Sequence, residues 1–343
     1  MAITSSAWHA AGLPLLLERR DLPDELVRTA VGDLTAGTFD ESEATAFLIG
    51  LRAKGEAASE IATAVEVLRG CMTRLNPPTR PVLDTCGTGG DGTGTFNIST
   101  TAAIVVAASG VPVVKHGNRS VSSRSGSADV LAALGVPVES GPVWAQRSIE
   151  NHAFAFCFAP QFHPALAKVG PLRRKLGVRT IFNLLGPLLN PGGAEHQLLG
   201  VGKRDLLDAM AGAVARLGTQ RAYLVCGDDG LDEVSLSAPT SVRLVRDRTI
   251  EALEWTASDF GLEPVSLSDL RADGPAASAA IVRSVLAGED GPCRRVVLAN
   301  AAAALLAAEQ VRTLPEGVRR AARSIDSGAA HDLLEKLCRP VEG

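Results

Sequence analysis

Residues 81–110 read PVLDTCGTGGDGTGTFNISTTAAIVVAASG. The stretch runs from a short apolar segment through five glycines at 87–94 into a run of small and β-branched residues. Glycines bring bare backbone N–H groups close to an anion, and the start of the following helix directs its positive end to the same place. A simple turn with a helix cap needs one hydroxyl and no glycine series. The loop at 87–100 therefore predicts a phosphate-binding site between a strand and a helix.

Two common nucleotide motifs do not explain this loop. Gly87 to Gly92 satisfies Gly-x-Gly-x-x-Gly, but a dinucleotide fold also needs an acidic residue about 20 positions later. No acidic residue lies between Asp91 and Asp129. A P-loop is excluded as well, because no Gly-Lys-Ser/Thr follows the glycines.

Two further loops are expected to complete the site. A predicted strand at 111–114 leads into KHGNRSVSSR at 115–124, and no acidic residue lies between Gly92 and Ala128. A second predicted strand at 222–225 leads into Asp228-Asp229-Gly230-Leu231-Asp232-Glu233. Open α/β sheets bind ligands at the carboxyl ends of their strands. The acidic run on its own reads as a polar turn, but beside a polyphosphate Asp232 and Glu233 could hold Mg²⁺, which prefers one or two carboxylates with phosphate oxygens and water.

The remaining pattern predicts two regions. Helical periodicity without strand signals runs from Leu13 to about Leu75, including a helix that starts at Asp40 and one over 58–75. Three prolines at 77, 78 and 81 mark a boundary, because proline cannot continue a helix. Beyond it, strands alternate with helices, which indicates a parallel or mixed sheet covered on both faces. The expected strands are 82–83, 111–114, 153–158 and 222–225, and the expected helices are 99–109, 127–134, 204–217 and several within 275–337.

Composition narrows the class of protein. The chain has 343 residues, 46% hydrophobic and 21% charged, which is ordinary for a globular enzyme of about two domains. A net charge of −4 argues against nucleic-acid binding. No apolar run is long enough to span a membrane, and no signal peptide is apparent. Six dispersed cysteines without a Cys-x-x-Cys motif suggest reduced thiols, so a cytoplasmic location is expected.

Three long segments resemble the anthranilate phosphoribosyltransferase family: GTGGDGTGTFNIST at 87–100, KHGNRSVSSRSGSADVL at 115–131 and RTIFNLLGPLLNP at 179–191. The resemblance covers nearly the whole chain, through EGVRRAARSIDSGAAHDLLEKL at 316–337. It implies a small all-helical domain at 1–78, joined by helices from about 170–192, and a larger α/β domain at 79–343 with a central, mostly parallel sheet flanked by helices. It also implies a homodimer formed through the helical domain. The implied reaction is Mg²⁺-dependent transfer of phosphoribosyl from phosphoribosyl pyrophosphate to the amine of anthranilate, with two Mg²⁺ ions per monomer.

The resemblance also assigns site residues. Those implied for phosphoribosyl pyrophosphate are Gly87, Gly90, Asp91, Thr95, Asn97, Ile98, Ser99, Thr100, Lys115, His116, Gly117, Asn118, Arg119, Ser120, Val121, Ser122, Ser123 and Ser127. Those implied for anthranilate are Gly87, Asn118, His163 and Arg173, with Pro164 beside its entry path. Ser99, Asp232 and Glu233 are implied Mg²⁺ ligands. One departure is that Leu166-Ala167-Lys168 stands where the family often has Met-Lys after Ala165, so the basic side chain is shifted by one position.

Two alternatives stay open at this point. A pyrimidine nucleoside phosphorylase shares the two-domain architecture and a phosphate-binding glycine loop, but it would need no Mg²⁺ and would not make pyrophosphate. A non-catalytic, nucleic-acid-binding relative would be expected to show a basic surface and eroded metal residues. We expect no strong general base in the transferase reaction, because an aromatic amine is a neutral nucleophile at pH 7 that mainly needs positioning.

Overall fold

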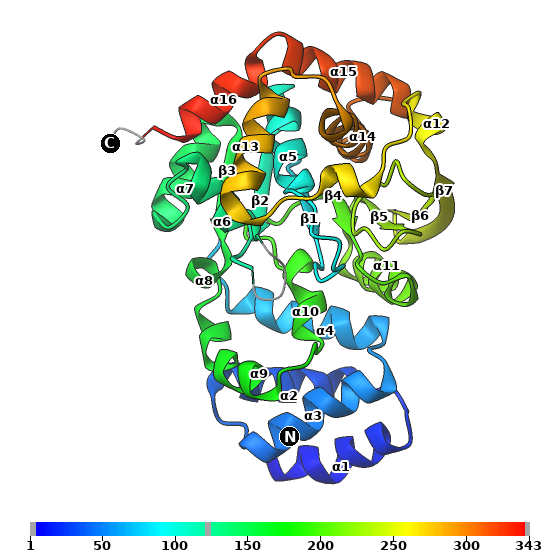
Figure 1. Cartoon of the computed structure of the whole chain (residues 1–343). Coiled ribbons are helices and arrows are strands. Elements are labelled where there is room, and N and C mark those ends of the chain that lie inside the picture. Colours follow the sequence, from blue (N-terminus) through cyan, green and yellow to red (C-terminus); the bar gives the residue numbers. More distant parts are fainter. Residues whose placement is uncertain (1–4, 121–124, 340–343) are drawn as a thin grey trace.

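The computed structural model describes residues 5–120 and 125–339, and its two parts are visible in Figure 1. The N-terminal part is a group of four helices: α1 (Ser5–Leu17), α2 (Asp24–Ala36), α3 (Glu41–Lys54) and α4 (Ala58–Gly70). The Asp40 side chain accepts a hydrogen bond from the Ser42 N–H and caps α3, as the sequence predicts. Trp8 of α1 lies fully buried against Phe39 and Phe47, so aromatic edge contacts close this small core.

The larger part is built on one seven-stranded sheet. Its strands are β1 (Leu83–Gly87), β2 (Val113–Gly117), β3 (Phe154–Phe158), β4 (His196–Gly200), β5 (Arg221–Gly227), β6 (Thr240–Arg246) and β7 (Thr249–Trp255). They lie in the order β3-β2-β1-β4-β5-β6-β7; the first five are mutually parallel, β6 is antiparallel to β5, and β7 is antiparallel to β6. This arrangement confirms the predicted α/β fold with a mostly parallel sheet.

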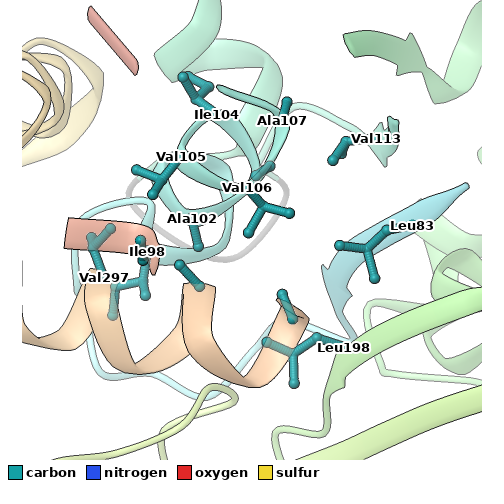
Figure 2. Close-up of a cluster of buried hydrophobic side chains, with 14 of the residues drawn as sticks. Leu83, Ile98, Ala102, Ile104, Val105, Val106, Ala107, Val113, Leu198 and Val297 are labelled. Atoms are coloured by element: carbon teal, nitrogen blue, oxygen red, sulfur yellow. The ribbon is translucent and has the colours of Figure 1, made fainter. Parts of the chain in front are cut away.

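Helices cover both faces of the sheet, and alternate side chains of each strand meet different cores. Leu198 of β4 belongs to the core shared with α5 (Ile98–Ala108) and α14 (Pro292–Ala307). Its neighbour Leu199 belongs to the core shared with α11 (Leu207–Leu217) and the N-terminal helices. Figure 2 shows the first of these cores, where Leu83 and Leu198 gather with side chains of α5 and α14.

The remaining helices complete these layers. They are α6 (Ser127–Leu134), α7 (Gly141–His152), α12 (Ala257–Phe260), α13 (Gly274–Leu286), α15 (Leu314–Asp326) and α16 (Ala329–Leu337), with short 3₁₀ turns at Arg204–Leu206 and Leu267–Leu270. The expected alanine-rich helices of the last third are therefore present. Helix α4 packs against α11, so the core of the N-terminal helices is continuous with one face of the sheet.

The segment between β3 and β4 runs back to the N-terminal helices (Figure 1). It contains α8 (Ala159–Phe162), a 3₁₀ turn at Pro164–Lys168, α9 (Gly170–Leu176), α10 (Phe182–Leu185) and a second 3₁₀ turn at Gly186–Leu188. Helix α9 contacts α3, α10 contacts α4, and the Lys168 ammonium donates to the Ala36 carbonyl over 2.8 Å. The chain thus crosses from the sheet to the helical part and returns before β4.

Several expected elements have different bounds. The helix expected to reach Leu75 ends at Gly70, because the Leu75 N–H bonds to the Pro191 carbonyl of the returning segment instead. The first strand covers 83–87 and the second 113–117, so both extend into the loops assigned to the site. The third starts at 154 because Ala153 has a left-handed backbone, with φ of 53°. Strands β4, β6 and β7 and helix α7 were not among the expected elements.

Candidate active site

One cavity of about 370 Å³ opens at the carboxyl ends of β1 and β2, where the segment between β3 and β4 forms part of its wall. Most of the residues assigned from the sequence line it. They are Gly87, Gly90, Asp91, Thr95, Asn97, Ile98, Ser99, Lys115, His116, Gly117, Asn118, Arg119, Ser120, Ser127, His163, Arg173, Asp232 and Glu233. The fold therefore brings together three loops that are up to about 145 residues apart, as expected for strand ends in an open sheet.

A few assigned residues lie elsewhere. Thr100 is fully buried behind the cavity, where its hydroxyl donates to the Asn97 side-chain oxygen over 3.2 Å. Thr100 thus orients Asn97, the residue that precedes α5, and does not face the cavity itself. Pro164 is absent from the cavity wall among the described residues. The assigned residues Val121, Ser122 and Ser123 lie outside the described residues.

The glycine loop has the backbone geometry that its sequence requires. Gly89 and Gly90 both have left-handed backbones, with φ of 63° and 74°, which residues with a Cβ adopt only at a cost. The Thr88 N–H donates to the Gly200 carbonyl over 2.9 Å, which anchors the start of the loop to β4. Helix α5 then begins at Ile98 and directs its N-terminus at the cavity. Backbone N–H groups and the helix end together favour an anion here.

The second loop supplies a buried cation. Lys115 at the end of β2 is only 2% exposed, and its ammonium donates to the Thr85 carbonyl and to the Ser99 hydroxyl. Because the Lys115 ammonium is already buried beside the glycine loop, it can bind a phosphate without losing further contact with water. The carboxylate of Glu233 lies nearby and partly balances this charge. Burial raises the pKa of Glu233, and the positive charge of Lys115 opposes that rise.

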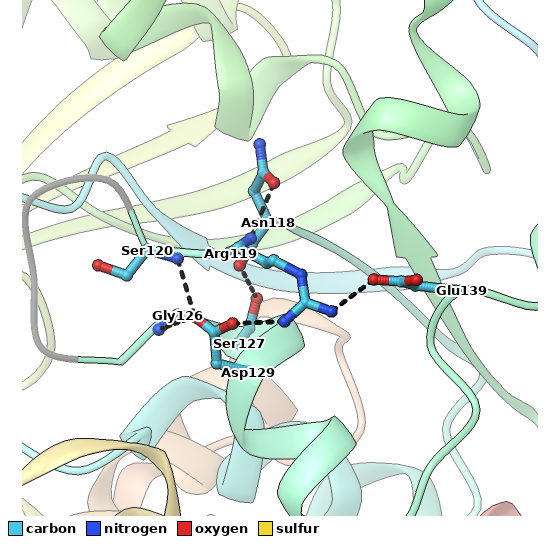
Figure 3. Close-up of polar contacts among 7 residues, drawn as sticks. All are labelled: Asn118, Arg119, Ser120, Gly126, Ser127, Asp129 and Glu139. Carbon is cyan, nitrogen blue, oxygen red and sulfur yellow. Dashed lines mark hydrogen bonds and ion pairs between the residues drawn. The ribbon is translucent and has the colours of Figure 1, made fainter.

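Arg119, in contrast, is occupied by acidic partners (Figure 3). Its guanidinium contacts Asp129, at 2.8 Å, and Glu139. The other Asp129 oxygen accepts from the N–H groups of Ser120 and Gly126, so one carboxylate fixes both ends of this loop. Arg119 lines the cavity, and its guanidinium holds the loop in shape through Asp129.

The acidic loop lies directly against the glycine loop and the start of α5. Asp232 accepts from the Gly89 N–H at 2.9 Å, and Glu233 accepts from the Ser99 N–H at 3.0 Å. Burial raises the pKa of both carboxyl groups; repulsion from Asp91 adds to the rise at Asp232, and repulsion from Asp232 adds to the rise at Glu233. Buried, mutually repelling oxygens are a donor set that suits a hard divalent cation.

The same residues do not enclose a metal by themselves. Within 5–120 and 125–339, no three His, Cys, Asp or Glu side chains are grouped to hold a metal ion. Mg²⁺ commonly binds through one or two carboxylates while water and substrate phosphates complete its octahedron. Asp232 and Glu233 fit that mode of binding, in which the phosphorylated ligand supplies the missing oxygens.

The opposite wall of the cavity is formed by a histidine pair and apolar residues. His116 and His163 are buried with their Nε2 atoms 3.2 Å apart, and His116 Nδ1 donates to the Gly186 carbonyl at 3.1 Å. Burial lowers the pKa of His116 to about 3 and that of His163 to about 4, so both rings are neutral at pH 7. Because the His116 proton is on Nδ1, the His116 Nε2 atom accepts a hydrogen bond from the His163 Nε2–H group. The pair shapes this wall without adding charge.

Arg173 enters the same side of the cavity from α9. Its guanidinium lies 5.5 Å from the centre of the Phe182 ring, and burial lowers its pKa. Within the described residues, the Arg173 side chain lies against the Phe182 ring and forms no hydrogen bond or ion pair. A half-buried guanidinium without a carboxylate partner, beside an aromatic ring, is suited to bind an aromatic carboxylate.

Some wall residues were not predicted. Arg179, Phe182 and Asn183 line the cavity from the loop and helix that follow α9. All three belong to the segment RTIFNLLGPLLNP, whose length and specificity could have pointed to them. Leu166 also lines the cavity, whereas Lys168 bonds to α2. The shifted basic residue therefore ties the returning segment to the helical part and does not lie in the cavity wall.

Comparison with known proteins agrees with this geometry. Residues 79–331 match the α/β domain of a glycosyl transferase family, and residues 14–72 match its helical bundle domain. An anthranilate phosphoribosyltransferase of Desulfitobacterium hafniense strain Y51 is 48% identical over 325 residues, which cover 95% of this chain and 96% of the relative. The chain belongs to the anthranilate phosphoribosyltransferase family.

Solved structures of the family share the whole fold. The crystal structure of the Thermus thermophilus member has a TM-score of 0.88 and 42% identity, and the match covers 95% of this chain and 98% of that one. The Saccharomyces cerevisiae member in complex with phosphoribosyl pyrophosphate and Mg has a TM-score of 0.86 at 29% identity, covering 98% of both chains. The same yeast protein in complex with 4-fluoroanthranilate has a TM-score of 0.87 at 28% identity, covering 98% of this chain and 97% of that one. No helix in the described parts of this chain is long and apolar enough to cross a membrane.

Proposed function

We propose that this chain transfers the phosphoribosyl group of phosphoribosyl pyrophosphate to the amine of anthranilate, giving N-(5-phosphoribosyl)anthranilate and pyrophosphate. The observation that carries the proposal is a single cavity with two unlike halves. One half has a glycine loop, a helix N-terminus and buried Lys115, which suit a polyphosphate; the other has Arg173 beside Phe182 and a neutral histidine pair, which suit an aromatic carboxylate. The family to which the chain belongs supports the same pairing of substrates.

The chemistry needs charge stabilisation more than proton transfer. When the bond from the ribose C1 to pyrophosphate breaks, positive charge develops on the sugar and negative charge on the leaving group. Backbone N–H groups of the glycine loop and the Lys115 ammonium are placed to stabilise that negative charge. The anthranilate amine is neutral and nucleophilic at pH 7, so Arg173 contributes by holding its carboxylate and thereby orienting the amine toward C1.

Mg²⁺ would be held by Asp232 and Glu233, with Ser99 nearby, and it would neutralise the departing pyrophosphate when bound. We propose two ions per monomer, as the family resemblance implies, at the carboxylates that accept from the Gly89 and Ser99 N–H groups. We propose that the assigned residues that line the cavity contact the two substrates.

Assembly and organisation are further parts of the proposal. We place the boundary of the helical domain at 78, with the helices at about 170–192 joining that domain. The family resemblance favours a homodimer formed through the helical domain. The large exposed side chains of Leu17 on α1 and Ile49 on α3 provide apolar surface for it. A cytoplasmic location fits a biosynthetic enzyme with six cysteines, all of them free.

An assay of the purified protein tests the main proposal. Anthranilate fluorescence should fall when phosphoribosyl pyrophosphate and Mg²⁺ are both present, and it should not fall when either is omitted. Under the phosphorylase alternative, the protein would instead consume a pyrimidine nucleoside with inorganic phosphate and leave anthranilate untouched. Under the non-catalytic alternative, neither reaction would occur and nucleic acid would bind.

A further inference from the structure

Arg179 holds the glycine loop from the side of the returning segment. It lies between α9 and α10, and its guanidinium donates to the Gly89 carbonyl at 2.8 Å and to the Thr88 carbonyl at 3.1 Å. The donor and acceptor residues are about 90 positions apart in the sequence. A planar fork that reaches two successive carbonyls fixes the orientation of both peptide groups in a way that a single donor cannot.

The sequence of the loop is adapted to this contact. A Cβ added to Gly90 would lie 1.5 Å from Arg179 Nη1, so the guanidinium occupies the space that any other side chain would need. Gly90 also has a left-handed backbone, with φ of 74°. Glycine at 90 therefore serves the approach of Arg179 as well as the turn of the loop.

The orientation of the carbonyls decides where the loop presents its N–H groups. In a trans peptide the C=O and the following N–H point in opposite directions. The Thr88 carbonyl faces Arg179, and the next N–H, that of Gly89, points away to Asp232 at 2.9 Å. The Gly89 carbonyl also faces Arg179, so the Gly90 N–H must point away from it as well, and it has no acceptor within the described residues. Gly90 lines the cavity, which makes this N–H a free donor for a ligand.

The opposite side of the loop is fixed too. The Thr88 N–H donates to the Gly200 carbonyl, and the Gly202 N–H donates to the Thr88 hydroxyl, both over 2.9 Å. Arg179 bonds to one side of residues 88 and 89, and β4, Gly202 and Asp232 bond to the other side. The peptide planes of these two residues therefore cannot rotate without breaking hydrogen bonds. Removing Arg179 breaks the bonds on its own side and leaves the others in place.

We infer that Arg179 is a positioning residue for the reaction: it turns the peptide groups of the glycine loop so that the Gly90 N–H is available to the pyrophosphate group. This inference rests on the proposed function, because it assigns the anion at the loop to phosphoribosyl pyrophosphate. It concerns the half of the cavity that would bind phosphoribosyl pyrophosphate, although Arg179 lies in the same segment as Arg173, which is proposed to bind anthranilate.

The test compares Arg179→Ala and Arg179→Lys with the control Arg174→Ala, which removes an exposed charge from the same segment. Both Arg179 variants should lower kcat/KM for phosphoribosyl pyrophosphate by about tenfold to a hundredfold, as expected for losing charge-assisted hydrogen bonds, and change the anthranilate KM by less than about threefold. Lysine keeps the charge without the fork, so it should not restore activity. The control should match the wild type.

Hydrogen exchange of the ligand-free proteins gives a readout that needs no catalysis. Exchange in peptides covering residues 87–92 should accelerate in both Arg179 variants, while peptides from β5 and α11 keep the wild-type rate. Uniformly faster exchange, equal losses for both substrates, or full rescue by lysine would overturn the inference. If the wild type itself transferred nothing to anthranilate, the proposed function would fail, and the exchange experiment would still decide whether Arg179 orders the loop.

Discussion

The substitution Arg173→Ala isolates recognition of the acceptor. Arg173 is half-buried on α9, its guanidinium lies 5.5 Å from the centre of the Phe182 ring, and it has no acidic partner within the described residues. Burial without such a partner lowers its pKa, so the free protein holds a cation that is incompletely compensated. The anthranilate carboxylate would supply the missing charge. Removing the guanidinium should therefore weaken the binding of anthranilate much more than it weakens the fold.

The structure sets the size of both effects. A hydrogen bond to a charged group contributes roughly 1.5–3 kcal/mol, which corresponds to an increase of about tenfold to a hundredfold in the anthranilate KM. The fold loses only the contact with Phe182, about 0.5–1 kcal/mol for a partly exposed cation over a ring. The KM for phosphoribosyl pyrophosphate should stay nearly constant, because the donor half of the cavity is built from residues 87–100 and 115–120.

The assay is steady-state loss of anthranilate fluorescence with each substrate varied in turn, together with a thermal melt of each variant. Arg174→Ala provides the matched control, because Arg174 is exposed on the same helix. Arg173→Lys should recover only part of the affinity, since a single ammonium cannot match a carboxylate with two parallel donors. Equal losses for both substrates, or an Arg173→Ala protein indistinguishable from the control, would refute an acceptor role.

The remaining predictions concern metal, pH and assembly. Replacing Asp232 by Asn and Glu233 by Gln should reduce Mg²⁺-dependent activity by at least the roughly 10–100-fold typical of disturbing a metal site, without lowering the melting temperature; unchanged activity at every Mg²⁺ concentration would count against the site. Burial holds the pKa of His163 at about 4, below its unfolded value of about 6.5. The folded protein therefore binds fewer protons, and stability is lost as the pH falls below about 6.5, by up to about 1.4 kcal/mol per pH unit. Denaturant unfolding of wild type and His163→Asn should show their difference shrinking between pH 7 and 5, and a constant difference would contradict this. Light scattering should give about twice the 35.6 kDa chain mass, whereas a monomer at micromolar concentration would rule out the proposed dimer.

Local sequence signals identified the part of the site that depends on local structure. The glycine loop, the basic loop and the acidic loop each follow a strand, and parallel strands end at one edge of a sheet. For that reason Gly87, Lys115 and Asp232 could be placed at one cavity before the fold was known. The resemblance to a family added Arg173, which a basic run alone would have assigned to a solvated helix face.

The features that could not be predicted from the sequence depend on contacts between distant segments. Strand β4 lies between β1 and β5 through pairings that no local pattern encodes. Helix α4 ends at Gly70 because the Leu75 backbone pairs with Pro191, more than 100 residues away. Arg179 looks like one more basic residue after α9, and its meaning appears only when its guanidinium is found against the carbonyls of residues 88 and 89.

The proposed function requires that one cavity joins a phosphoribosyl donor to anthranilate. The most direct measurement follows anthranilate fluorescence and pyrophosphate release together in one reaction of the wild-type protein with phosphoribosyl pyrophosphate and Mg²⁺. We expect one pyrophosphate to appear for each anthranilate consumed, and chelation of the Mg²⁺ to stop both. Pyrophosphate release that does not depend on anthranilate, or no loss of anthranilate at any Mg²⁺ concentration, would contradict it.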